Sequence, residues 1–72
     1  MYKIIIHIEN NEEVETNEYT DMSGIPAIIN IIVRKMLKKQ VISTPGCELK
    51  YNGDTIDNIN PHKIIGVSVR QT

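Results

Sequence analysis

The segment YKIIIHIE, residues 2–9, decides the fold, because its side chains alternate between two rows of different character. One row contains Tyr2, Ile4, Ile6 and Ile8, and the other contains Lys3, Ile5, His7 and Glu9. A period of two residues with one strongly apolar row is typical of a strand that packs one face against a core. We therefore expect the chain to begin with a strand over residues 2–9.

A second strand is expected directly after the first. Asn10 and Asn11 predict the turn between them, since Asn tolerates the left-handed backbone that tight hairpins need. Residues 13–20 then place Val14 and Thr16 on one side. The other side carries Glu13, Glu15 and Tyr19. The pattern predicts a β-hairpin whose outer side is acidic.

One helix is expected over residues 24–41. Ser23 is suited to the N-cap, and Pro26 is tolerated in the first turn. Basic residues gather at the other end, where they complement the helix dipole. At 100° per residue, the core-facing stripe contains Ile25, Ile28, Ile29, Ile32, Val33 and Met36. The opposite stripe contains Ala27, Ile31, Arg34 and Lys38.

The C-terminal third predicts three further strands. Residues 47–51 form the first of them, and Asn52-Gly53 is a strong hairpin signal that would place Leu49 opposite Ile56. A turn at residues 58–62 leads into a last strand over residues 63–71. Its two rows are Ile65, Val67 and Val69 against Ile64, Ser68 and Arg70. This strand is apolar enough for a central position in the sheet.

The order ββαβββ in one domain, residues 1–72, predicts the α+β class, with one helix packed on one face of a sheet. Because the first and last strands are the most apolar, we expect them to pair in parallel in the middle of that sheet, which is the β-grasp arrangement. Ile4, Ile6, Val67 and Val69 would then be buried. The chain resembles ubiquitin-like domains in length, in element order and in the stretch from Glu48 to Arg70. Residues 69–72 contain no diglycine, so the resemblance implies the fold without carrier or modifier chemistry.

Composition and motifs argue against catalysis. The candidate reactive residues Cys47, His7 and His62 lie in different predicted elements, and no ligand cluster with metal-site spacing is present. We therefore expect no enzymatic activity, no cofactor and no metal. The single Cys47 forms no internal disulfide, which favours a reducing cytoplasm. No segment approaches the ~20 apolar residues of a membrane span.

The charges are strongly segregated. Residues 4–33 contain six acids and no Lys or Arg, and half of the eight basic residues follow within residues 34–39. The basic cluster, Arg34, Lys35, Lys38 and Lys39, accompanies the outward-facing Ile31 and forms one candidate partner-binding surface. The acidic hairpin around Glu13, Glu15 and Tyr19 forms the other, because its first two carboxylates lie about 6.6 Å apart along a strand and resemble nucleic-acid phosphates.

These features favour a small non-enzymatic protein-binding module. Abundant Ile, Asn and Lys indicate an AT-rich genome, so we expect a phage or mobile-element factor that docks on a host protein and inhibits or redirects it. Two alternatives use the same surfaces: nucleic-acid binding by the basic helix end, or nucleic-acid mimicry by the acidic hairpin. The net charge of −1 and the lack of aromatic residues among the basic ones disfavour nucleic acid. Homo-oligomer formation through an exposed strand stays open.

Overall fold

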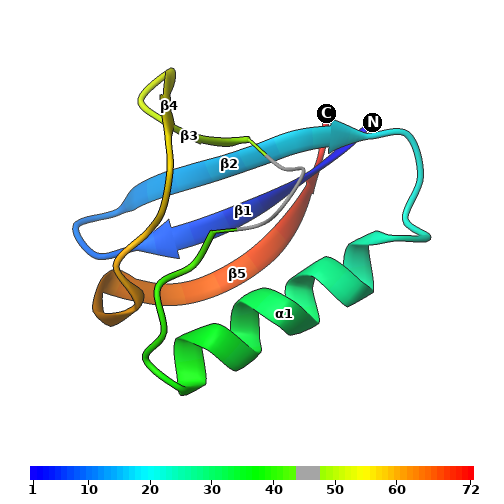
Figure 1. Cartoon of the computed structure of the whole chain (residues 1–72). Coiled ribbons are helices and arrows are strands. Elements are labelled where there is room, and N and C mark those ends of the chain that lie inside the picture. The colour runs from blue at the N-terminus through cyan, green and yellow to red at the C-terminus, as the bar shows by residue number, and fades with distance from the viewer. Residues whose placement is uncertain (44–47) are drawn as a thin grey trace.

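The computed structural model describes residues 1–43 and 48–72, and the predicted strand start at Cys47 lies outside them. The described residues form five strands and one α-helix, which lies on one face of the sheet (Figure 1). The elements are β1 (Tyr2–Ile8), β2 (Glu12–Tyr19), α1 (Ile25–Leu37), β3 (Leu49–Tyr51), β4 (Asp54–Ile56), the 3-10 helix η1 (Pro61–Lys63) and β5 (Ile64–Gln71). The protein is thus a small α+β domain, as the sequence predicts.

The core lies between α1 and the sheet. The predicted apolar row of β1 is confirmed, because Ile4, Ile6 and Ile8 are all buried. From α1, Ile25 and Ile32 are buried against them, as the helical period predicts. The remaining buried members of this core are Val14, Ile42, Leu49, Ile59 and Ile64.

The last strand does not lie where the sequence suggests. The strand order is β4-β3-β2-β1-β5, and every neighbouring pair is antiparallel, so the expected parallel pairing of β1 with β5 is wrong. The connection before β5 explains this, because the backbone N–H of Glu9 donates to the carbonyl of Lys63 at 3.0 Å. That contact fixes the start of β5 beside the end of β1, and the chain can only run back along β1. As part of an edge strand, Val67 and Val69 are half-buried and not buried as expected.

A β-bulge in β2 changes which residues face the core. Ile5 pairs with Glu15 but Lys3 pairs with Glu18, so two residues of β2 oppose Ile4. Beyond the bulge the alternation reverses. Tyr19, expected on the acidic outer side, instead pairs with Tyr2 and packs against the core.

A second irregularity alters the start of β5. His7 pairs with Gly66, but Ile8 pairs with Ile64, which leaves Ile65 as the extra residue. The predicted row of Ile65 with Val67 and Val69 is therefore wrong at its first member. Ile64 enters the core, and Ile65 is 69% exposed.

Both predicted hairpin turns are present. Asn10 and Asn11 have φ values of 67° and 58°, and Asn52 and Gly53 have φ values of 52° and 84°. These left-handed conformations are the ones that Asn and Gly adopt most readily. The second turn pairs Leu49 with Ile56, as predicted.

The helix is shorter than residues 24–41. Ser23 does not cap it, because the Ser23 N–H and hydroxyl both donate to Asp21 Oδ1, at 2.9 and 2.6 Å, and Gly24 takes the N-cap position. At the other end, Lys39 adopts φ 57° and its N–H donates to the Met36 carbonyl at 3.1 Å. The N–H of Gln40 donates to the Lys35 carbonyl at 2.9 Å, which completes a Schellman motif and ends α1 at Leu37.

Candidate functional site

The outer face, the sheet face turned away from α1, carries most of the predicted acidic surface, and its charges are paired. Arg70 donates two hydrogen bonds to the carboxylate of Glu13, at 3.2 and 2.7 Å. The ammonium of Lys3 lies 3.2 Å from Glu15 and 3.8 Å from Glu18. The hydrogen bond from Arg70 and the nearby charges of Arg70 and His7 hold the pKa of Glu13 below its usual value. Glu13, Glu15 and Glu18 thus each lie within ion-pair distance of Arg70 or Lys3.

This ion pairing covers an apolar residue. Ile5 is 0% exposed although it belongs to the outer face. In the register of the sheet, Arg70 lies opposite Lys3 and Glu13 lies opposite His7, one row to either side of Ile5. The contact between Arg70 and Glu13 therefore crosses the sheet diagonally over Ile5. We infer that this ion pair contributes to the structure of the sheet.

Three residues of the outer face, Ser68, His7 and Glu13, lie in the same order as the nucleophile, base and acid of a hydrolase triad. The His7 Nε2 and Ser68 Oγ share a hydrogen bond of 2.7 Å, and His7 Nδ1 lies 3.6 Å from Glu13 Oε2. The second distance is too long for the hydrogen bond that orients a catalytic histidine, and Glu13 is already bound by Arg70. In addition, strand N–H groups lie in the plane of the sheet and cannot form an oxyanion hole above Ser68. These side chains are positioned to hydrogen-bond across strands.

Sequence reasoning missed this cluster for a specific reason. Residues 7, 13 and 68 meet only because β1 lies between β2 and β5, with β5 antiparallel. A parallel β5 would have placed other residues opposite His7. The cluster could have been found from the sequence only by predicting that the turn at residues 58–63 returns the chain to the end of β1.

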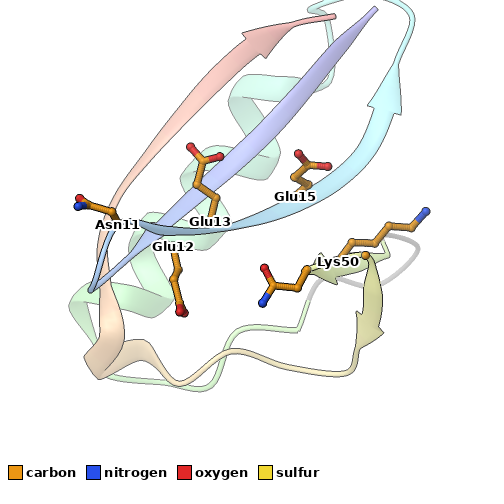
Figure 2. Close-up of a pocket in the computed structure, with 7 residues that line it drawn as sticks. Asn11, Glu12, Glu13, Glu15 and Lys50 are labelled. Carbon is orange, nitrogen blue, oxygen red and sulfur yellow. The ribbon is translucent and has the colours of Figure 1, made fainter.

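An open hollow of about 370 Å³ lies between β2 and the β3–β4 hairpin (Figure 2). Its lining residues are Asn11, Glu12, Glu13, Glu15, Lys50, Asn52 and Gly53. Figure 2 shows the side chains of Glu13 and Glu15 on one side of β2 and that of Glu12 on the other. Glu12 accepts a hydrogen bond from the Tyr51 hydroxyl, which raises the pKa of Tyr51. The three acids do not converge, and no group of three or more potential metal ligands occurs in the described part of the chain.

The outward stripe of α1 differs from the outer face. We define the helix surface as Ile31, Arg34, Lys38 and Lys39, all of which are exposed, with Ile31 at 46%. Within residues 1–43 and 48–72, none of its three cations contacts a carboxylate. Lys35, predicted as part of the same cluster, is half-buried and donates to the carbonyl of Ser43 at 3.3 Å. The helix surface is thus an exposed isoleucine followed by three cations that have no carboxylate partner among the described residues.

No protein-family model, curated protein or solved structure matches this chain. Among the described residues, no helix is both long and apolar enough to span a membrane.

Proposed function

We propose that this protein is a small binding module that docks through its helix surface on an acidic surface of another protein. The proposal rests on one observation: the acidic region and the basic region of the chain differ in whether their charges have partners within the fold. The carboxylates of the outer face are paired with Lys3 and Arg70, whereas the cations of the helix surface have no carboxylate partner in the parts of the chain that the structure describes. Unpaired charge of one sign steers a partner of the opposite sign.

Two features of the helix surface support this function. Ile31 lies about one turn before Arg34 on the same stripe, so a partner would gain an apolar contact beside the charged ones. Lys39 occupies a left-handed position at which Gly is favoured, and a non-Gly residue there costs about 1–2 kcal/mol. The presence of a lysine here in spite of that cost supports a binding role for its side chain.

The origin and cellular setting form a finer part of the proposal. The abundance of Ile, Asn and Lys supports a phage or mobile-element factor. In this setting the module acts in the cytoplasm, where it inhibits or redirects a host protein without catalysing a reaction.

The alternatives are less well supported. Nucleic acid would use the same cations, but the chain has a net charge of −1 and no aromatic residue among residues 31–39 for base stacking. Mimicry of nucleic acid by the acidic hairpin requires free carboxylates, and Glu13 and Glu15 both form ion pairs.

The test compares a double variant with a charge-matched control in pull-downs followed by binding kinetics. Ile31→Asp combined with Arg34→Glu changes the net charge by −3 and removes the apolar residue of the helix surface. Thr20→Asp combined with Lys63→Glu makes the same change in net charge at exposed positions outside α1. Thermal melts establish that both variants are folded.

We expect the first variant to lose the captured partner and the control to retain it. The charge change should mainly slow association, and the loss of Ile31 should mainly hasten dissociation. A folded Ile31→Asp, Arg34→Glu variant that binds like the wild type would remove the helix surface from consideration. A salt-sensitive complex with duplex DNA, lost in the same variant, would favour the nucleic-acid alternative.

A further inference from the structure

The two edges of the sheet differ in length and in protection. One edge is β4, with only three residues, and the other is β5, with eight. Figure 2 shows β5 at the rim of the sheet, and no other described strand lies beyond it, while α1 packs on one face beside it. The outward backbone N–H and C=O groups of β5 therefore lack a neighbouring strand within the described chain. Such a row of donors and acceptors is a template for pairing with another strand.

The features that usually prevent such pairing are nearly absent from β5. Residues 64–69 contain no Pro and no charged residue, and Ile65 is 69% exposed. The irregularity at Ile65 protects only the start of the strand. On the core side, Val67 and Val69 are half-buried because the sheet stops at this edge. The central part of β5 is thus an open strand with an incompletely covered apolar row.

We propose that β5 pairs in antiparallel fashion with β5 of a second copy of this chain, about a two-fold axis at Ser68. In this register, Val67 lies opposite the partner's Val69, and Val69 opposite the partner's Val67. Both valines point to the core face, so the two half-covered rows complete one another. The outer-face Ser68 lies opposite the partner's Ser68, where two small hydroxyl side chains fit.

The charge on β5 selects this register over its neighbours. Arg70, the charged residue of the strand, lies opposite the partner's Gly66. A Cβ built on Gly66 meets nothing within 4 Å, so the arginine has room there. The two arginines are then about 14 Å apart along the strands, and their repulsion is weak. A register centred on Arg70 would place them directly opposite one another, and one centred on Gly66 would place the irregularity at Ile65 near the middle of the interface.

This interface leaves the helix surface available. A two-fold axis perpendicular to the sheet places both copies of α1 on the same face, with their outward stripes away from the sheet. The pairing therefore stands on the edge of β5 and does not depend on the proposed docking function. If both hold, the dimer presents two helix surfaces to one partner or to two.

The experiment measures the mass in solution and the register by cross-linking. Light scattering or sedimentation of the wild type, over about 1 µM to 1 mM, should show a rise from the 8.2 kDa of one chain towards twice that mass. In a Cys47→Ser background, Ser68→Cys should form a disulfide-linked dimer under mild oxidation, because opposed Cβ atoms lie about 4.5–5.5 Å apart. Thr55→Cys, exposed on the β4 edge, is the matched control and should form far less.

A disruptive variant gives an independent readout. Ser68→Lys places two like charges opposite one another at the axis without touching the core, and should raise the dimer dissociation constant at least tenfold. Thr55→Lys should leave it unchanged. Circular dichroism confirms that each variant is folded. A wild type that stays at 8.2 kDa throughout overturns the proposal. So does a folded Ser68→Cys that cross-links no better than Thr55→Cys, or a dimer unaffected by Ser68→Lys.

Discussion

Thr16 shows how one side chain makes an irregular strand pairing tolerable. It is 3% exposed and lies in the bulge where β2 has an extra residue opposite Ile4. The bulge disrupts the backbone ladder at this point, and the Thr16 hydroxyl accepts a hydrogen bond of 3.1 Å from the N–H of Ile4. A buried N–H without a partner would be costly, so the hydroxyl is part of the sheet's hydrogen bonding.

We predict that Thr16→Val lowers the free energy of unfolding by about 1–3 kcal/mol, because it leaves the buried N–H of Ile4 unsatisfied while keeping a similar volume. Thr16→Ser keeps the hydroxyl and should cost less than Thr16→Val. Urea unfolding of the three proteins measures the difference. A Thr16→Val variant as stable as the wild type, beside a destabilised Thr16→Ser, would mean that the methyl group, and not the hydrogen bond, is what matters.

For single residues, the sequence predicts the backbone conformation well only where the residue's own side chain determines it. Asn10, Asn11 and Asn52 adopt positive φ as expected, because their short side chains tolerate that conformation. Lys39 adopts it for another reason, since the end of α1 imposes it. Ser23 was wrongly expected to cap α1, because Asp21 competes for its hydroxyl and its N–H.

At the scale of elements, alternation identifies strands but not their neighbours. The pattern of residues 63–71 is the same whether the strand lies centrally or at an edge, and whether it runs parallel or antiparallel to β1. The connection through η1 decides both, since it delivers β5 to the end of β1. The two wrongly assigned faces, at Tyr19 and Ile65, both follow register shifts. Each shift reverses the alternation, and a residue type marks only the second, since Gly66, which is common at β-bulges, lies beside Ile65.

The ion pair between β5 and β2 predicts how stability depends on pH. Arg70 lowers the pKa of Glu13 below its usual 4.5, so the pair stabilises the fold fully above that value. Stability is lost as the pH falls through the lower pKa of the folded state. In Arg70→Gln the pKa of Glu13 should return towards 4.5, so this part of the acid-induced loss should disappear.

We therefore expect the melting temperatures of the wild type and Arg70→Gln to differ most at about pH 6 and to converge as the pH falls below 4.5 and through the lowered pKa of Glu13. Thermal melts across this range measure the convergence. Glu13→Gln is the control and should behave like Arg70→Gln, since either change removes the same pair. Parallel curves for wild type and Arg70→Gln would contradict a stabilising role.

For the whole molecule, charges that are separated along the sequence are partly brought together by the fold. Lys3 belongs to the same hairpin as the acids, but Arg70 is 57 residues from Glu13 and reaches it only because β5 lies beside β1. Only the contact between distant strands reveals this, so the sequence shows the row of acids without the arginine that pairs with Glu13. The outward stripe of α1 was predicted correctly, because its residues are related by the local period of one helix.

The position of β1 predicts the order in which the fold opens. β1 is paired on both sides, with β2 and with β5, and Ile4, Ile5 and Ile6 are all 0% exposed. Opening β1 breaks both ladders and exposes the core from either face. By contrast, β4 is a three-residue edge strand paired only with β3, and its residues are exposed or half-buried. Local opening of β4 therefore costs little, whereas β1 opens only when the whole domain unfolds.

We predict that, in native-state hydrogen exchange, the amides of β1 exchange last, with an opening free energy equal to that of global unfolding. The amides of β4 should exchange first, through openings that depend little on denaturant. In dilute protein, β5 should alternate between slow amides that face β1 and fast amides that face solvent, because one side of an edge strand is unpaired. Exchange measured by NMR at low and rising denaturant separates these classes. If β4 exchanged as slowly as β1, the sheet would open as one cooperative unit, and the ranking by strand position would be wrong.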